Sequence, residues 1–194
     1  PAGLLTASRV WYLRNCVDIT FDQCYVAHCV NGWVGLDDSD GSQYETNVIR
    51  MINCTSIQLA GHAVVNPYVG WSMFACNFEL GAGGIPSGIT NTASKSITNL
   101  CLYACDFADA SAAGAWIDIG NVFNFSMIGG AILGLSLGNS IYGIKIGGAY
   151  NAGINIQGVH FGALDSGIVI SATSNAVLIE GNTTRQVIAS LLGE

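Results

Sequence analysis

Short stretches of alternating apolar and polar residues, interrupted by glycine or asparagine, recur along nearly the whole chain. One set ends in cysteine or glycine and comprises Tyr12–Cys16, Arg50–Cys54, Ser72–Cys76, Cys101–Cys105, Phe125–Gly129, Ile154–Gly158 and Val177–Gly181. A second set begins with glycine, at Gly32, Gly61, Gly88, Gly114, Gly143 and Gly167. Because side chains alternate between the two faces of a strand, each stretch predicts a short β-strand.

The two sets interleave in a constant order, with most repeats 22 to 29 residues apart. A period of this length with two strands and Gly- or Asn-rich turns is typical of a solenoid whose coils pair about 4.8 Å apart. Leucine-rich repeats need a leucine spacing that is absent here, and a β-sandwich would lack the longer repeat. The sequence therefore predicts one all-β domain over residues 1–194, a parallel β-helix of about six or seven coils. We expect this domain to be a segment of a longer chain.

The period-2 alternation also predicts the core. Residues two before the terminal Cys or Gly should point inward, namely Ile52, Phe74, Tyr103, Met127, Ile156 and Ile179. The terminal position itself should stack as a column of small buried thiols, Cys16, Cys54, Cys76 and Cys105, with Gly129, Gly158 and Gly181 replacing them later. Seven cysteines without a Cys-x-x-Cys pair indicate neither a zinc site nor a full disulfide framework. Free thiols favour assembly in a reducing compartment.

Composition excludes several partners and suggests another. The chain is 51% hydrophobic and 10% charged, with six Lys and Arg and a net charge of −7. So few cations exclude nucleic-acid binding, and interrupted apolar runs exclude membrane insertion. Low charge instead predicts that identical subunits cover part of the surface. The expected contacts are outward positions of the second set, Val34, Ala63, Thr90, Trp116, Lys145 and Val169.

Two kinds of repeat alternate in the C-terminal half, Gly-Ile-x-Ile stretches at 143–146 and 167–170 and Asn-led strands at 151–158 and 175–181. In these features the chain resembles the right-handed parallel β-helices of the pectate-lyase superfold, especially bacteriophage tailspikes and tail-fibre receptor-binding proteins. The resemblance implies a homotrimer in the virion tail, assembled with other tail proteins in the host cytoplasm, which binds host-surface polysaccharide without a cofactor. Whether it also cleaves the polysaccharide stays open. A polysaccharide-degrading hydrolase or lyase and a purely structural spike are the alternatives.

Carboxylates are few, and the densest group is Asp37, Asp38 and Asp40, in a loop that ends near Tyr44. Glycoside hydrolysis uses two carboxylates roughly 5–9.5 Å apart. Long loops on a rigid scaffold often carry binding or catalytic residues, so these aspartates are catalytic candidates. The alternative is a solvated turn held by Asx-type hydrogen bonds. No metal site is expected, because the spacing does not match an EF-hand loop.

Polygalacturonases share the superfold, and their motif order is similar to Asp22, Asp37-Asp38, Gly61-His62-Ala63 and Ile144-Lys145 here. The similarity implies a catalytic role for His62. Ala63 and Gly143 depart from that motif, however, and the repeat alone accounts for Gly61-His62. His62 is therefore either a catalytic residue or a hydrogen-bonded histidine of the scaffold.

Two aromatic residues flank the acidic loop, Trp33 before it and Tyr44 at its end. Aromatic rings offer flat apolar faces with few rotatable bonds, which suits sugar binding. Trp33 and Tyr44 are therefore candidates for carbohydrate binding, with packing in the core as the alternative for each.

Overall fold

The fold is a parallel β-solenoid of about six turns, as the sequence predicts. The computed structural model describes residues 9–14, 16–35, 47–79, 81–86, 88–91, 96–135, 137–170 and 173–193. Its 18 strands form one continuous sheet in which every strand pair is parallel. One short 3-10 turn, η1 (Ala82–Gly84), is the only helical element in the described part.

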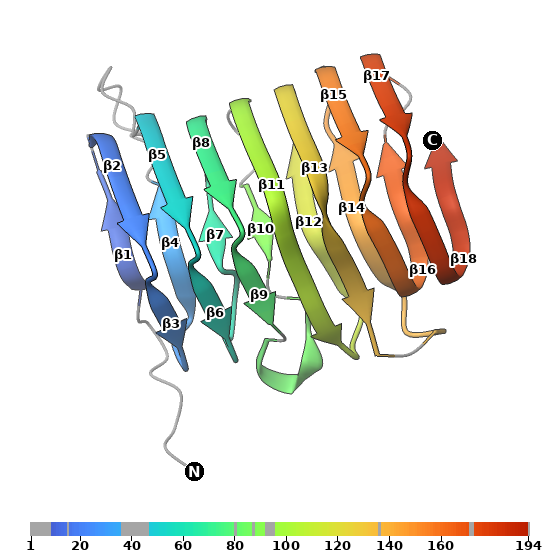
Figure 1. Cartoon of the computed structure of the whole chain (residues 1–194), viewed down its shortest axis with the longest axis horizontal. Coiled ribbons are helices and arrows are strands. Elements are labelled where there is room, and N and C mark those ends of the chain that lie inside the picture. Colours follow the sequence, from blue (N-terminus) through green and yellow to red (C-terminus); the bar gives the residue numbers. More distant parts are fainter. Residues whose placement is uncertain are drawn as a thin grey trace.

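Three flat faces run the length of the solenoid, with neighbouring coils side by side (Figure 1). Face A contains β1 (Arg9–Leu13), β4 (Asn31–Gly35), β7 (Val64–Val65), β10 (Ile89–Thr90), β12 (Gly114–Gly120), β14 (Ile141–Gly147) and the second half of β16 (His160–Ile170). Face B contains β2 (Val17–Asp22), β5 (Asn47–Ile52), β8 (Val69–Phe74), the first halves of β11 (Ile97–Ala110) and β13 (Val122–Gly134), β15 (Asn151–Gln157) and β17 (Ser174–Glu180). Face C contains β3 (Tyr25–Ala27), β6 (Thr55–Ile57), β9 (Asn77–Glu79), the second halves of β11 and β13, the first half of β16 and the start of β18 (Thr183–Gly193). We number the coils 1 to 7 by their face-B strands.

The chain bends from face B to face C at one left-handed residue in each coil. These residues are Gln23, Asn53, Ala75, Ala104, Gly129, Gly158 and Gly181, with φ between 50° and 68°. A left-handed residue favours glycine or a small or polar side chain, which explains the composition of this column. Gly129, Gly158 and Gly181 therefore stack on the residues that precede the cysteines, and the prediction that they replace the cysteines is wrong.

The true thiol column begins one strand later than predicted. Cys54, Cys76 and Cys105 occupy equivalent positions, because Ile52 pairs with Phe74 and Phe74 with Tyr103. Cys24 is the member from coil 1, since Asp22 pairs with Ile52. Cys16 does not belong to this column, because the strand before it, β1, pairs with β4 on face A. All seven cysteines are free thiols.

The one-residue shift in register inverts half of the predicted core positions, as expected for a period of two. Met51, Met73 and Leu102 are buried, whereas Ile52, Phe74 and Tyr103 point outward. The predictions for Met127 and Ile156 are confirmed, and Ile179 packs against the same core.

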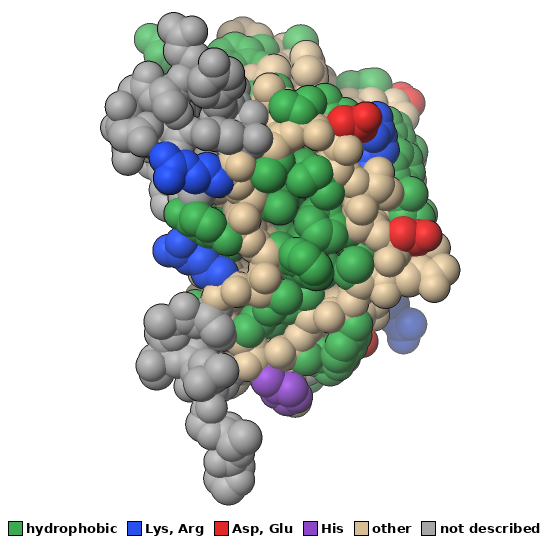
Figure 2. Space-filling model, turned by 90° about the vertical axis from the view of Figure 1, so that its left-hand side faces the viewer, with side chains coloured by type: hydrophobic (Ala, Val, Ile, Leu, Met, Phe, Trp, Pro, Cys, Tyr) green, Lys and Arg blue, Asp and Glu red, His purple; other side chains and the backbone are tan. Residues whose placement is uncertain are grey.

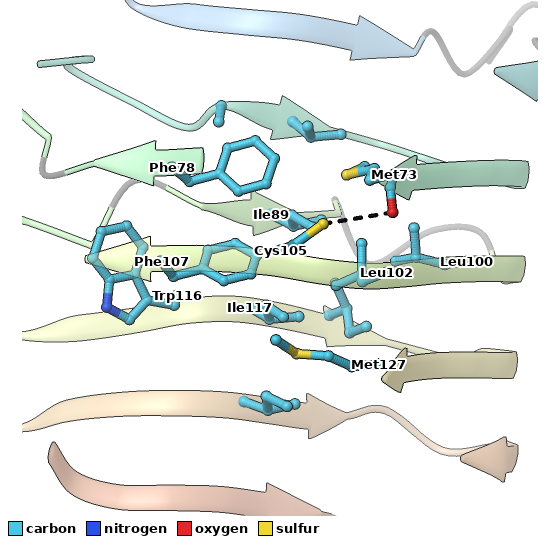
Figure 3. Packing of buried hydrophobic residues seen from close by; sticks show 14 of the residues in the cluster. Met73, Phe78, Ile89, Leu100, Leu102, Cys105, Phe107, Trp116, Ile117 and Met127 are labelled. Atoms are coloured by element: carbon cyan, nitrogen blue, oxygen red, sulfur yellow. Dashed lines mark hydrogen bonds between the residues drawn. The ribbon is translucent and has the colours of Figure 1, made fainter. Parts of the chain in front are cut away.

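Aromatic rings stack through the core from coil to coil. Phe78 and Phe107 stack with centroids 4.8 Å apart, and Phe107 contacts Trp116 at 5.9 Å. The Cys105 thiol lies beside these rings and donates a hydrogen bond to the carbonyl of Met73 (Figure 3). The rings and thiols together fill the space between the three faces.

Face A also corrects the expected outward positions. The pairing of β4, β7, β10, β12, β14 and β16 aligns Gly32 with Ala63, Gly88, Trp116, Gly143 and Gly167. Ala63 and Trp116 are fully buried, so the prediction that they face outward is wrong. The outward column contains Val34, Thr90, Lys145 and Val169, but Val34 and Val169 are buried too. Face A is therefore not the broad apolar surface predicted from the sequence.

The first coil exposes apolar side chains of the described residues at the end of the solenoid. Figure 2 views the molecule along its axis and shows hydrophobic side chains gathered on the end formed by β1, β2 and β3. Trp11 is 40% exposed there, and Val10, Tyr12, Val17 and Tyr25 are also exposed.

Candidate functional site: a polar groove on face A

The residues singled out in the sequence do not come together as one site. Asp37, Asp38, Asp40 and Tyr44 lie outside the described residues. Trp33 is fully buried in the core of coil 2, so its ring offers no face to a sugar.

His62 lies at the corner where the chain passes from face C of coil 2 to face A of coil 3. Its backbone N–H donates to Asn31 Oδ1 at 2.9 Å, and its carbonyl accepts from Gly32 N at 3.1 Å. Gly61 is required beside it, because a Cβ there would lie 2.4 Å from Asn31 Oδ1. Burial lowers the pKa of His62, and Asp118 opposes this shift. The imidazole is therefore neutral at neutral pH. Its buried Nδ1 has no hydrogen-bond partner in the described part of the chain, so the hydrogen bonds of His62 at this corner come from its backbone.

The order of motifs similar to polygalacturonases is not matched by proximity in space. Asp22 ends a face-B strand in coil 1, whereas Lys145 lies on face A in coil 6. Five coil spacings of about 4.8 Å separate these levels by roughly 24 Å along the axis. Asp22 and Lys145 therefore cannot act on one bond.

A polar groove of about 290 Å³ instead lies along the border of face A in coils 4 to 6. Its side chains include a carboxylate, an ammonium group, two amides and a hydroxyl, contributed by Asp118, Lys145, Asn91, Asn121 and Thr90. Ile119 and three glycines, Gly120, Gly147 and Gly148, line the rest, and at the glycines backbone groups are accessible to a ligand. The groove can therefore offer hydrogen-bond donors and acceptors from three consecutive coils.

The charged pair of the groove comes from two equivalent strands. Ile117-Asp118-Ile119 of β12 pairs with Ile144-Lys145-Ile146 of β14, so the isoleucines point into the core and the charged residues point outward. Lys145 Nζ lies 4.0 Å from Asp118 Oδ2, and both side chains are about half exposed, at 49% and 48%. An exposed pair of this kind contributes at most about 1 kcal/mol to stability. Both groups therefore remain available to a ligand.

Two asparagines hold the wall of the groove by hydrogen bonds between coils. Asn91 Nδ2 donates to the carbonyl of Gly120 at 3.0 Å, and Asn91 Oδ1 accepts from Gly120 N at 2.9 Å. Asn121 Oδ1 accepts from the backbone N–H groups of Ala149 and Tyr150 at 3.0 and 3.4 Å. These amides fix the backbone of successive turns, so the groove is built on a rigid frame.

Sequence reasoning missed Asp118 as a partner of Lys145. Aligning the repeats on their glycines placed Gly114 opposite Gly143, whereas Gly114 pairs with Ile141. The signal was present in the repeated pattern Ile-x-Ile-Gly, at 117–120 and 144–147. Alignment on the isoleucines, which carry the core, would have brought the two charges together.

A larger cavity, about 360 Å³, lies at the last coil and is a different kind of feature. Phe161, Ile168 and Ile179 line it together with Glu180 and Asn182. Because these apolar residues belong to the core columns, this cavity is the open end of the core, whereas the groove on face A is a surface of polar side chains.

The fold and groove define a class, a parallel β-solenoid with a polar groove on one flat face. Comparison with known protein families, curated proteins and solved structures finds no match for the chain. Within the described ranges, no three His, Cys, Asp or Glu residues come close enough to bind a metal ion. The described part also contains no helix of a length and apolarity that would cross a membrane.

Proposed function

We propose that this chain is the receptor-binding solenoid of a phage tailspike, which attaches to host-surface polysaccharide through the groove on face A. The observation that carries the proposal is the Asp118, Lys145, Asn91 and Asn121 cluster on a rigid, flat sheet. Sugars present many hydroxyl groups, which both donate and accept hydrogen bonds. Carboxylates accept such bonds, ammonium groups donate them and amides do both, so the groove suits a polyhydroxylated chain.

The resemblance of the repeats to tailspike β-helices supports placing the protein in the virion tail, beside other tail proteins. A solenoid also suits recognition of a long polymer, because equivalent positions repeat about every 4.8 Å along its axis. Several sugar units can therefore contact consecutive coils at once.

Binding without cleavage is the function that the described groove supports better. Hydrolysis of a glycosidic bond ordinarily requires two carboxylates flanking it. Asp118 is the one carboxylate among the described residues of the groove. The proposal is therefore tested against two alternative functions, a depolymerase and a purely structural spike.

The test is binding of the purified chain to an array of bacterial capsular and lipopolysaccharide glycans. We expect one glycan class to bind, and Asp118→Asn and Lys145→Met each to weaken binding about tenfold, the effect of losing one charge-assisted hydrogen bond. Melting temperatures should change little, because the pair is exposed.

Matched controls are Asp22→Asn on face B and Arg185→Met on face C, both exposed and outside the groove. These variants should bind as the wild type does. Release of oligosaccharides from the bound glycan would show that the chain is a depolymerase and does not only bind. Absence of binding to every glycan, or equal loss in the control variants, would overturn the proposal.

A further inference from the structure

The exposed apolar side chains of the solenoid gather on one of its three faces. Outside coil 1 and the connecting turns, the large hydrophobic residues that are 37 to 44% exposed are Val48, Phe74, Phe123, Ile128, Val177 and Leu178. All six lie on face B, in β5, β8, β13 and β17. Among the side chains of faces A and C whose exposure the structure describes, none beyond coil 1 belongs to this group. Face B, which lies toward the viewer in Figure 1, is thus the apolar side of the molecule.

A ridge of large side chains crosses the middle of face B. The face-B ridge consists of Ile52, Phe74, Tyr103 and Ile128, which occupy paired positions in coils 2 to 5. The rings of Phe74 and Tyr103 stack in parallel, with centroids 5.1 Å apart and an interplanar angle of 8°. Stacking covers the ring faces and leaves the edges outward. The ridge is therefore poorly suited to stacking against sugar rings and well suited to packing against protein side chains.

A column of small residues, which we name the face-B channel, runs beside the ridge. The face-B channel consists of Ser72, Cys101 and Ser126, which occupy the outward column two residues before the ridge. A ridge and a channel that run side by side on one face are self-complementary, because the ridge of one copy fits the channel of another. Isologous interfaces between identical chains have this property.

Charge is confined to the two ends of face B. Arg50 and Asp18 form an ion pair in coils 1 and 2, and Gln157 Nε2 donates to Glu180 Oε1 at 3.0 Å in coils 6 and 7. Between them, ridge and channel contain no charged residue. An uncharged apolar centre with a polar rim is the anatomy of a protein–protein interface.

The area of face B also suffices for a stable contact. Coils 1 to 7 at about 4.8 Å per strand, with six residues across at about 3.3 Å each, give roughly 700 Å². Two such faces bury roughly 1,400 Å², within the 1,200–2,000 Å² of specific interfaces. Parallel sheets, moreover, are normally covered on both sides.

We propose that a second copy of this chain packs on face B, with the face-B ridge of each copy seated against the face-B channel of the other. The proposal is independent of the groove, which faces away on face A. It replaces the homotrimer contact expected on face A, where Ala63 and Trp116 are buried, with a twofold contact on face B.

The test is the mass of the chain in solution, measured by size-exclusion chromatography with multi-angle light scattering across a dilution series. The wild type should have twice the chain mass at high concentration and approach the mass of one chain on dilution. Phe74→Lys/Ile128→Lys should raise the dissociation constant by about 100-fold or more, because it places ammonium groups in the apolar centre. Its matched control is Ile57→Lys/Leu133→Lys, which changes two half-buried outward residues of face C.

Circular dichroism checks that both variants fold, and alkylation of Cys101 supplies a second readout. Cys101 is partly exposed in one chain and lies in the face-B channel. It should react with iodoacetamide more slowly in the assembled wild type than in the ridge variant, whereas the partly exposed Cys24 should react equally in both. A monomeric wild type, an unchanged mass for the ridge variant, or Cys101 that reacts equally in both would overturn the proposal.

Discussion

At the scale of single residues, left-handed backbone conformations set which side chains the repeat tolerates. Besides the corner between faces B and C, a second left-handed column lies near the start of each face-B strand: Asp18, Val48, Gly70, Asn99, Asn124, Gly153 and Ala176, with φ of 53° to 67°. Asn124 Nδ2 donates to Asn99 Oδ1 at 3.0 Å, so asparagines stabilise neighbouring coils here. Val48 is the one β-branched member, and β-branched residues are strained in this conformation.

Replacing Val48 by asparagine should stabilise the protein. Val48 is 37% exposed, so little buried area is lost, and left-handed strain of about 1 kcal/mol is relieved. We expect the free energy of unfolding in urea to rise by about that amount. The control is Val69→Asn, a half-buried residue of face B outside the left-handed column, which should give no gain. A Val48→Asn variant less stable than the wild type would contradict this account of the column. Val48 also lies on face B, so the comparison is made at concentrations where the chain is monomeric.

Gly148 should be essential for a different reason, because Asn121 packs closely against it. Gly148 has φ of 92°, and a Cβ there would lie 2.5 Å from Asn121 N and 2.7 Å from Asn121 Oδ1. Gly83 has a similar φ of 75° but open space around it. We expect Gly83→Ala to cost about 1 kcal/mol and Gly148→Ala at least twice that, as measured by thermal unfolding. An equal loss of stability in the two variants would show that the turn beside the groove is not packed as described.

At the scale of elements, the thiol column links the strands of coils 1 to 4 through the core. The Cys54, Cys76 and Cys105 thiols donate to the carbonyls of Phe21, Met51 and Met73 in the preceding coil, at 3.5 to 3.6 Å. A hydrogen bond with the Cys105 side chain is the largest cause that raises the pKa of Cys76 to about 12, and burial adds to it. A hydrogen bond with Cys76, followed by burial, raises the pKa of Cys54. The folded chain therefore keeps Cys54 and Cys76 protonated, whereas the hydrogen bond with Cys76 lowers the pKa of Cys105.

Because of the thiol column, the free energy of unfolding should fall at alkaline pH. The unfolded thiols lose their protons near their ordinary pKa of 9.0, whereas folded Cys76 holds its proton to about pH 12. The stabilisation is thus complete below pH 9 and is lost as pH rises toward 12. Between pH 8 and pH 10, the wild type should lose about 1–3 kcal/mol more than Cys54→Ala/Cys76→Ala, measured by urea unfolding. If the free energies of unfolding of both proteins changed with pH in parallel, the raised pKa values would be contradicted.

The elements were predictable from the sequence, but their exact register was not. The repeat period alone gave the parallel β-helix, because each coil must bury its inward residues against the next. The predicted register was wrong because the corner residues and the thiols were treated as one column. Gly129 and Cys105 are both small, but they differ in backbone conformation. Face C was not predicted, because its strands β3, β6 and β9 are only three residues long. The Asp118–Lys145 pair depended on that register and was missed with it.

At the scale of the whole molecule, the three faces have different surfaces and therefore different tasks. Face A carries the polar groove of Asp118 and Lys145, and face B carries the apolar ridge. A chain that assembles through face B leaves the groove on face A accessible to a polymer outside the assembly. Attachment and assembly can then proceed without competing for one surface.

The central claim, that face A holds the glycan-binding groove, is tested most directly by mapping amide chemical shifts while an oligosaccharide from the bound glycan is titrated. The account predicts shifts at Thr90, Gly120 and Gly147, which line the groove, and none at Ser72 or Ser126 on face B. Shifts centred on face B or on the open end of the core beside Phe161, with the groove unchanged, would contradict it.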